Sequence, residues 1–338
     1  MPKKDHFTLS VVVPCYNEET VIELTHKTIK QTLGGQSGFD LEVIYVDDGS
    51  QDGTAAIIEK LAHGDDQTQL VLLSRNFGHQ AAVMAGMGAA RGDVVAVMDA
   101  DLQDPPDVIL KMIAKWREGF EVVYGVRTQR KEGLLKRLTY ASFYRMYRWL
   151  ADIEVPLDSG DFSLMDRQVV DVMNGLPEIN RFNRGLRSWA GFRQTGLVYE
   201  RAARAAGDAK YSWGNLVALA FDGIFSFSTA PLRLIFIVGI SVALLAAAFS
   251  VFYFLFGTLG FEVMGRDPKD VPGFTSLILA ILFFSGVQLI SIGILGEYLG
   301  RIYNEVKRRP IYVVKRGDQP RNDGEADGNE RSNSGTGH

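Results

Sequence analysis

The sequence predicts an α/β domain with a Rossmann-like sheet, followed by a C-terminal hairpin of two transmembrane helices. Short β-branched runs alternate with helical patterns from residue 8 to about residue 130, which is typical of a parallel sheet covered by helices on both faces. Two later runs, Leu234–Phe261 and Val271–Gly296, contain no charged residue. Each exceeds the roughly 20 apolar residues that a helix needs to cross a bilayer.

The expected strands are apolar and end at polar motifs. They are Thr8–Pro14, Leu41–Val46, Gln69–Ser74, Asp93–Met98 and Glu121–Tyr124, with helices such as Glu19–Leu33 and Thr54–His63 between them. In sheets of this kind, ligands bind at the carboxyl ends of the strands. The polar motifs that follow the strands therefore mark the expected functional site.

Composition narrows the class of protein. A formal net charge of -4 argues against a nucleic-acid-binding protein, which normally carries a basic surface. Cys15 is the single cysteine, so no internal disulfide can form. The charged segment Met1–Phe7 is not followed by the apolar core of a signal peptide, so no cleaved leader is expected.

Basic residues beside the uncharged runs predict the orientation of the hairpin. Arg233 precedes the first run, and the second run is followed by Arg301, Lys307, Arg308, Arg309, Lys315 and Arg316. By the positive-inside rule, both termini are cytoplasmic and the connector Glu262–Asp270 lies outside. A pair of buried core helices is the alternative, but such helices are usually shorter.

Glycines in the second run suggest self-association. Gly296 and Gly300 have the small-xxx-small spacing that lets membrane helices approach closely. A homo-oligomer, with a tetramer as one option, is therefore expected. The alternative is that glycine is simply frequent in membrane helices.

Two stretches have the composition of interfacial amphipathic helices. Leu134–Leu150 mixes basic and aromatic residues, and Ser212–Ser228 is mostly apolar and leads into the first membrane run. Such segments lie at lipid headgroups, although the first can instead be a solvated helix packed on the sheet. The expected divisions are a cytoplasmic domain (1–211), an interfacial helix (212–231), the hairpin (232–300), a basic cytoplasmic segment (301–316) and a disordered tail (317–338).

One acidic motif is suited to a metal ion. Asp99 and Asp101 follow the strand Asp93–Met98, and Gln103 comes two residues later. Two carboxylates one residue apart can hold a hard divalent cation through oxygen ligands, and Gln103 can add another. Such a cation would stabilise a diphosphate as a leaving group. Acidic turns are common at strand ends, but further polar clusters at neighbouring strand ends favour the functional interpretation.

Those further clusters are suited to a nucleotide. After the first strand, Tyr16 can stack on a nucleobase and Glu18 can accept hydrogen bonds from ribose hydroxyls. After the second strand, Asp47 can accept from the N–H of a uracil. Helix capping is the alternative for this second cluster, and it suits Asp52 and Thr54 better than Asp47.

A series of motifs gives the sequence a specific resemblance. PCYNEE, VDDGSQDGT, SRNFGHQAAVMAG, MDADLQDPP, SGDFSLMDRQVV, AGDAKYS and LGEYLGRIY occur in this order. Together they resemble the family 2 inverting glycosyltransferases of GT-A fold, in the branch that acts on polyprenyl phosphates and includes dolichyl-phosphate mannosyltransferases. The resemblance is greatest to bactoprenol glucosyltransferases, and it extends from about residue 8 to residue 316.

The resemblance implies a function and a location. It implies transfer of a hexose from a UDP-sugar to undecaprenyl phosphate, with Mg²⁺ or Mn²⁺ as cofactor. Glucose is the first expectation, followed by N-acetylglucosamine or galactose. It also implies a multi-pass enzyme of the bacterial cytoplasmic membrane, with its catalytic domain in the cytoplasm and a role in O-antigen modification of lipopolysaccharide.

The resemblance also assigns residues to roles. The uridine and donor sugar would be bound by Pro14, Tyr16, Glu18, Asp47, Arg75, Gly78, Asp99 and Arg127, with Arg127 near the sugar or the acceptor phosphate. The metal would be held by Asp99, Asp101 and Gln103, and the catalytic residues would be Asp161 and Asp101. Phosphates would be held by Arg201, Arg204 and Lys210. Relatives often carry arginine where this chain has Ser163, so a contact there is open.

The acceptor makes a strong general base less necessary. A phosphate monoester has a second pKa of about 6, so it is already largely a dianion at neutral pH. Asp161 is therefore expected mainly to orient the acceptor and the donor sugar. A processive polysaccharide synthase is a second interpretation, but the Gln-x-x-Arg-Trp motif is missing around Trp189. An inactive membrane scaffold is a third, and the intact Asp99 and Asp101 count against it.

Overall fold

The computed structural model describes residues 5–127, 159–179, 181–201, 230–259 and 274–316. These residues form two compact units. One unit contains a sheet with its flanking helices, and the other contains two long helices.

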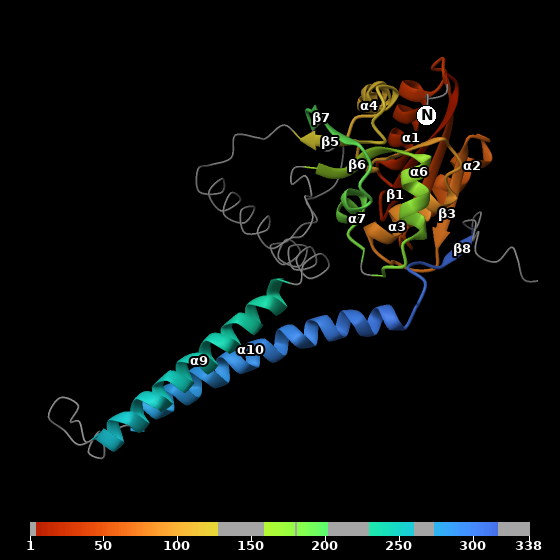
Figure 1. The fold of residues 1–338 in the computed structure, drawn as a ribbon. Coiled ribbons are helices and arrows are strands. Elements are labelled where there is room, and N and C mark those ends of the chain that lie inside the picture. The colour runs from red at the N-terminus through yellow and green to blue at the C-terminus, as the bar shows by residue number, and fades with distance from the viewer. Residues whose placement is uncertain (1–4, 128–158, 180, 202–229, 260–273, 317–338) are drawn as a thin grey trace, which may run out of the picture. The chain divides into compact units, whose positions relative to one another are not determined.

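The first unit is built on a mixed sheet (Figure 1). Among the described residues its strand order is β7-β5-β6-β4-β1-β2-β3-β8. The strands are β1 (Phe7–Cys15), β2 (Phe39–Asp47), β3 (Thr68–Leu73), β4 (Val94–Val97), β5 (Val122–Arg127), β6 (Ser159–Asp166), β7 (Gln194–Tyr199) and β8 (Val314–Arg316). β1 pairs in parallel with β2 and β4, and β2 pairs in parallel with β3. The carboxyl ends of these central strands therefore meet at one edge.

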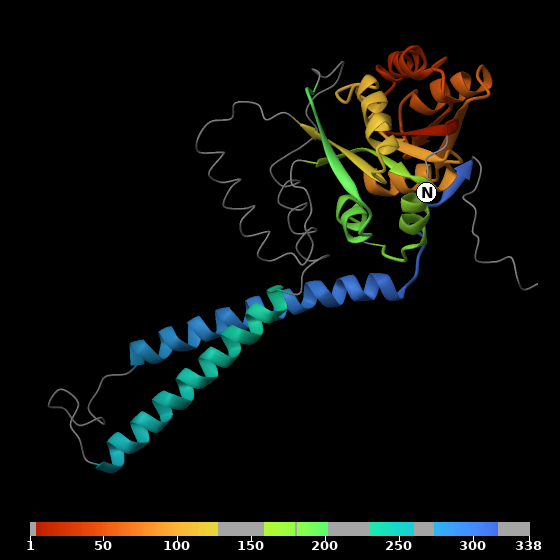
Figure 2. The same ribbon diagram turned by 45° about the horizontal axis from the view of Figure 1, so that its top comes forward.

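Helices cover both faces of this sheet (Figures 1 and 2). α1 (Ile22–Leu33), α2 (Thr54–His63) and α4 (Asp107–Arg117) form one layer, while α3 (His79–Ala89), α6 (Arg167–Gly175) and α7 (Asn183–Trp189) form the other. The pleat of β1 explains the two layers because successive side chains point to opposite faces. Val11 and Val13 belong to the core that includes α1 and α4, whereas a Cβ on Gly86 of α3 would lie 2.2 Å from Val12.

The strands predicted before residue 130 are confirmed, with ends that differ by a few residues. The helix over Thr54–His63 is confirmed, and α1 begins at Ile22 rather than at Glu19. The strands between residues 8 and 130 that pair directly with one another are parallel, as predicted. The complete sheet is mixed, because β6 runs antiparallel between β4 and β5 and β8 runs antiparallel to β3. The sequence of β6, SGDFSLMD, contains no β-branched residue, so the compositional signal for a strand is weak there.

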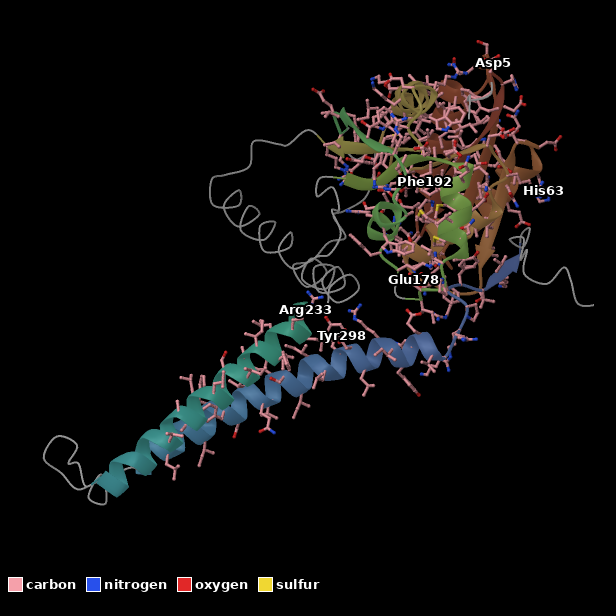
Figure 3. All side chains as sticks on the ribbon, in the orientation of Figure 1. Asp5, His63, Glu178, Phe192, Arg233 and Tyr298 are labelled. Carbon is pink, nitrogen blue, oxygen red and sulfur yellow. The ribbon has the colours of Figure 1, made fainter. Side chains whose placement is uncertain are left out.

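The second unit consists of α9 (Ala230–Leu259) and α10 (Phe274–Val306), which contact each other. Many of their described apolar side chains project outward (Figure 3), and Phe236 and Leu289 are about two-thirds exposed. Within the described residues, the segment Phe283–Val306 is long and apolar enough to cross a membrane, and a shorter apolar segment spans Pro231–Val242. Long helices thus form where the uncharged runs predict them.

Some expectations fall on residues outside the described part of the chain. They concern the interfacial stretches Leu134–Leu150 and Ser212–Ser228, the connector Glu262–Asp270 and the tail 317–338. The segment predicted as a basic cytoplasmic stretch, 301–316, contains the end of α10 and the strand β8.

Candidate active site

The loops after β1 and β2 are joined by hydrogen bonds at the carboxyl edge of the sheet. The backbone N–H of Asp48 donates to the carbonyl of Cys15 at 2.9 Å. The N–H of Asn17 donates to Ser50 Oγ at 3.0 Å, and Asn17 Oδ1 accepts from the N–H of Gln51 at 2.9 Å. The two predicted nucleotide clusters therefore form one polar surface.

Asp47 has the free acceptor that a base-binding role requires. Its side chain is buried, and Oδ2 accepts from the N–H of Ser50 at 3.0 Å. Oδ1 is also buried and has no hydrogen-bond partner among the described residues. Buried acceptors are normally satisfied, so this oxygen is suited to a ligand N–H. Asp52 instead accepts from the N–H of Thr54 at 3.0 Å. The N-cap of α2 is Gly53, so the prediction of Asp52 or Thr54 at that position is wrong, although Asp52 does bond to the first turn of the helix.

The SRNFG loop (74–78) is held against the turn after β2. Asp48 accepts from the N–H groups of Phe77 and Gly78 at 2.7 and 2.9 Å. Gly78 has a φ of 97° and Gly49 a φ of 68°, and both values favour glycine. A Cβ on Gly49 would lie 2.5 Å from the backbone carbon of Arg75, so only glycine allows this close approach.

The remaining predicted nucleotide residues border the same loops. Pro14 lies within β1, opposite Val46 of β2. Glu18 follows the strand, and its N–H donates to Thr54 Oγ1 at 2.8 Å. The Arg75 guanidinium is exposed and lies 3.9 Å from the centre of the Phe77 ring.

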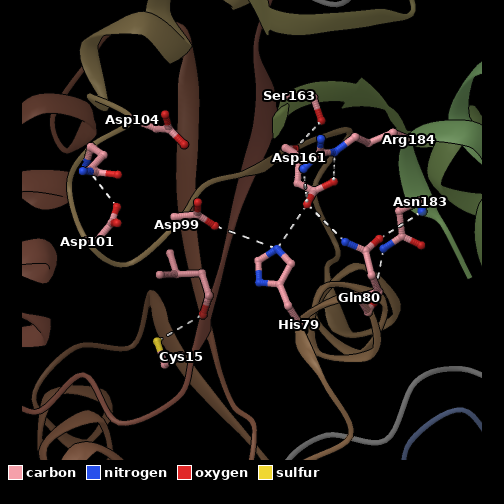
Figure 4. A network of polar contacts seen from close by, with 12 residues as sticks. Cys15, His79, Gln80, Asp99, Asp101, Asp104, Asp161, Ser163, Asn183 and Arg184 are labelled. Atoms are coloured by element: carbon pink, nitrogen blue, oxygen red, sulfur yellow. Dashed lines mark hydrogen bonds and ion pairs between the residues drawn. The ribbon is translucent and has the colours of Figure 1, made fainter. Parts of the chain in front are cut away.

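The Asp-x-Asp loop has an unusual backbone. Leu102, between Asp101 and Gln103, has a φ of 57°, and such conformations concentrate at functional sites. Asp101 is buried, and its Oδ1 accepts from the N–H of Gln103 at 3.1 Å. Asp99, about a third exposed, lies 3.9 Å from Nε2 of His79 (Figure 4).

Asp161 at the start of β6 is the centre of a polar network (Figure 4). Arg184 on α7 donates to both of its oxygens, at 3.0 and 3.3 Å. Gln80 donates from Nε2 to Oδ2 at 3.1 Å, and His79 Nε2 lies 3.3 Å from the same oxygen. Burial alone would raise the pKa of Asp161, but the charges of Arg184 and His79 hold that pKa well below its usual range.

Neighbouring charges also shift the pKa values of His79 and Asp99. Burial acts to lower the pKa of His79, but Asp161 and Asp99 outweigh it and raise that pKa. Burial also raises the pKa of Asp99; His79 opposes this shift, while the carboxylates of Asp104, Asp161 and Asp101 reinforce it. The site therefore concentrates negative charge around Asp99.

This donor set fits a divalent cation. The part of the chain that the structure describes has no group of three or more His, Cys, Asp or Glu side chains placed to hold a metal ion. Mg²⁺ usually binds proteins through one or two carboxylates, with substrate phosphates completing its shell. Asp99 and Asp101 would supply such a pair. The neighbouring carboxylates, which together with burial raise the pKa of Asp99, are what a cation would neutralise.

Arg127 and Arg201 lie on the side of the site formed by β5 and β7, across β4 from Asp47. Arg127 ends β5, and Arg201 follows β7. Both lie within 4 Å of Asp104, the last acidic residue of MDADLQD. Arg204 and Lys210, predicted to bind phosphates, lie outside the described residues.

The fold and the site define a glycosyltransferase, and comparisons with known proteins give its family. A model described as Glycosyl transferase family 2 matches residues 10–173. The chain is 45% identical over 312 residues to Uncharacterized glycosyltransferase YkcC of Bacillus subtilis, with 92% of this chain and 94% of that protein covered. It is 40% identical over 309 residues to the SfII prophage-derived bactoprenol glucosyl transferase of Shigella flexneri, with 91% and 97% covered.

The chain therefore belongs to glycosyltransferase family 2 and is a transferase enzyme with a mixed α/β sheet. The family predicted from the ordered motifs is confirmed. Among solved structures, mannosyltransferase PcManGT from Pyrobaculum calidifontis has a TM-score of 0.44 at 17% identity, with 90% of this chain and 88% of that chain covered. Similarity this weak adds no detail to the site.

Sequence reasoning missed several residues of the site. His79 and Gln80 lie in the motif SRNFGHQAAVMAG, and Asp104 lies in MDADLQDPP, so local motifs contained a signal for them. No local motif indicates Arg184, because it lies 23 residues from Asp161 in the chain and reaches it only through the placement of α7. Tyr199, which donates to Asp104, comes from still further away.

Proposed function

We propose that this enzyme transfers glucose from UDP-glucose to undecaprenyl phosphate, with inversion at the anomeric carbon and with Mg²⁺ or Mn²⁺ as cofactor. The observation that carries the proposal is the meeting of Asp47, Asp99 and Asp161 at one sheet edge in a chain so similar to a bactoprenol glucosyl transferase. The product would supply glucose for modification of a cell-surface glycan such as O-antigen.

The donor side of the proposal is supported by the surface around Asp47. Its unpartnered Oδ1 can accept from a uracil N–H, and Tyr16 and Glu18 border the same loops. The SRNFG loop, fixed by Asp48, presents Arg75 beside this surface. Asp99 and Asp101, with Gln103, would hold the cation, which would neutralise the diphosphate of the leaving UDP.

The chemistry of Asp161 supports a positioning role. A carboxylate whose pKa is well below its usual range accepts a proton poorly. The acceptor phosphate is already largely a dianion, with a second pKa of about 6, so it can attack the anomeric carbon without losing a proton to the enzyme. Asp161, fixed by Arg184 and Gln80, would instead hold the donor sugar in line with the incoming oxygen.

A multi-pass location in the cytoplasmic membrane forms part of the proposal. The exposed apolar side chains of α9 and α10 support it, and both termini would be cytoplasmic. Among the described residues, a Cβ on Gly296 or Gly300 would meet no atom within 4 Å. This open face of α10 supports a homo-oligomer.

A donor panel tests the proposal. Purified enzyme in detergent would be given undecaprenyl phosphate with UDP-glucose, UDP-N-acetylglucosamine or UDP-galactose. The lipid products would be identified by mass spectrometry. We expect a hexosyl product from UDP-glucose, formed only with a divalent cation, and a β-linkage by NMR. A product from another donor would reassign the sugar, and no product from any donor would overturn the proposal.

A further inference from the structure

A buried carboxylate connects three separate parts of the chain beside the proposed acceptor site. Asp104 lies in the loop after β4 and is fully buried. Its Oδ1 accepts a hydrogen bond from the hydroxyl of Tyr199 at the end of β7. Arg127 Nη2 lies 3.8 Å from Oδ2, and Arg201 Nε lies 3.9 Å from Oδ1.

Tyr199 is fixed by packing, so its hydroxyl has a defined position. A Cβ on Gly125 would lie 2.7 Å from the Tyr199 ring, and the Phe162 ring meets it edge-on at 5.3 Å. From this position the hydroxyl donates to Asp104 and accepts from Nε of Arg127 at 3.4 Å. Tyr199 thus links the carboxylate to one of the two guanidinium groups.

Within the described part of the chain, the two arginines keep donors available to a ligand. Each side chain is about a third exposed. The ion-pair distances of 3.8 and 3.9 Å exceed hydrogen-bond length, so Asp104 attracts the guanidinium groups without saturating their donors. Two guanidinium groups held by one carboxylate form a suitable site for a phosphate dianion.

Sheet topology indicates which phosphate this pair would bind. Arg127 and Arg201 lie at the ends of β5 and β7, on one side of β4, whereas Asp47 lies at the end of β2, on the other side. In an in-line displacement, the nucleophile approaches opposite the leaving group. A phosphate at the arginine pair would therefore approach the sugar from the side opposite the departing nucleotide.

We propose that Asp104 and Tyr199 are positioning residues that hold Arg127 and Arg201 together as a single binding site for the acceptor phosphate. This inference rests on the proposed transfer to a polyprenyl phosphate and deepens it. Asp104 touches neither substrate and acts through the two arginines.

Tyr199→Phe is the most informative variant because it keeps the ring and removes only the hydroxyl. We expect it to raise the KM for undecaprenyl phosphate about tenfold, the effect of weakening one charge-assisted hydrogen bond. The KM for UDP-glucose should stay within about twofold, because the residues around Asp47 are unchanged. Asp104→Asn should have a larger effect of the same kind. Asp107→Asn is the matched control. Asp107 begins α4, directly after the loop that contains Asp104, and within the described structure it pairs only with the exposed Lys111.

A double-mutant cycle separates positioning from general stability. Because Asp104 acts through both arginines, Asp104→Asn should raise the acceptor KM by a smaller factor in an Arg127→Ala background than in the native enzyme. If the two substitutions raised the acceptor KM independently, the idea that Asp104 acts through the arginines would be overturned. Equal increases in donor and acceptor KM would assign the arginines to the donor diphosphate and also overturn the inference. Thermal unfolding identifies any variant that fails to fold, and Tyr199→Phe then provides the test.

Direct lipid binding distinguishes this inference from the proposed function. The Kd for undecaprenyl phosphate would be measured with the enzyme in nanodiscs, without any donor. Weaker binding by Tyr199→Phe would support the inference even if the wild-type enzyme transferred no sugar. Active wild-type enzyme with an unchanged Kd and acceptor KM in Tyr199→Phe would overturn the inference alone. Absence of lipid binding by the wild-type enzyme would overturn both.

Discussion

At the scale of single residues, the site is governed by how charges neutralise one another. Asp161 is surrounded by His79, Gln80 and Arg184, so its carboxylate remains ionised and oriented. Asp99 lies where several carboxylates crowd together. The two aspartates therefore have different electrostatic surroundings, although His79 contacts both.

The first residue-scale prediction concerns the cation. Asp101→Asn should lower transfer at least a hundredfold because it removes one charge from an oxygen that would bind the metal and, through it, the leaving diphosphate. The protein should remain folded, as judged by thermal unfolding. The measurement is the transfer rate over a range of Mg²⁺ and Mn²⁺ concentrations. A wild-type rate in this variant, or full activity of the native enzyme in excess chelator, would contradict the metal assignment.

The second residue-scale prediction concerns pH. The pKa of His79 is raised in the folded protein above its unfolded value of about 6.5. His79 therefore stabilises the fold fully below about pH 6.5, and this contribution is lost as the pH rises through the folded pKa. In chelator, we expect the Tm to fall by a few degrees between about pH 6 and pH 9.

His79→Gln should reduce that fall, since glutamine does not titrate. His63→Gln provides the control, because His63 is exposed on α2 and its ring nitrogen bonds only to the carbonyl of Glu59 among the described residues. Calorimetry at matched ionic strength gives the slope. The same Tm slope in His79→Gln as in the native protein would show that the raised pKa does not contribute to stability.

At the scale of elements, the loops depend on close backbone approaches. The SRNFG loop lies against Gly49, and its next residues begin α3 with His79 and Gln80. Beyond β3, the sheet edge is covered by β8, and the carbonyl of Val313 accepts from the N–H of Ser74 at 2.9 Å. The loop that precedes His79 is thus fixed by the β2 turn and by the chain that follows α10.

The element-scale prediction tests the contact at Gly49. Gly49→Ala places a Cβ 2.5 Å from the Arg75 backbone at a φ of 68°, so the loop must move. We expect UDP binding to weaken about tenfold or more, because Arg75 and the Asp47 surface lose their arrangement. Gly64→Ala is the control, since its φ is −93° and its nearest neighbour would be 3.7 Å away. UDP binding by calorimetry would distinguish the two, and equal affinity in both variants would contradict the prediction.

At the scale of the whole molecule, the proposed function requires a water-soluble donor and a lipid acceptor to meet at one site. The sheet unit carries the charged groups, and the unit of α9 and α10 carries the exposed apolar side chains. Apolar helices of this kind are stable when lipid covers them.

The prediction at this scale concerns topology. A reporter fused after residue 316 should lie in the cytoplasm, and one inserted near Pro268 should lie outside, because basic residues flank the runs on the cytoplasmic side. Phosphatase and fluorescent-protein fusions report the two sides. Identical locations for both reporters would exclude a two-helix hairpin that crosses the membrane.

The sequence by itself determined the family, the central strands and the residues at their ends. Tyr16, Asp47 and Asp99 could be found from the sequence because each comes after an apolar run that is typical of a strand. Parallel strands bring their carboxyl ends to a common edge, so these residues were expected to lie together. The sequence also predicted the two long helices from uninterrupted apolar composition.

Only the tertiary structure decided how these groups act. β6 runs antiparallel between β4 and β5 and brings Asp161 beside His79, and α7 adds Arg184 from 23 residues away. The same folding joins Asp104 to Tyr199 across 95 residues. Ionisation and orientation depend on distances between side chains that are remote in sequence. Local composition does not encode such distances, which exist only once the sheet order and the helix packing bring those side chains together.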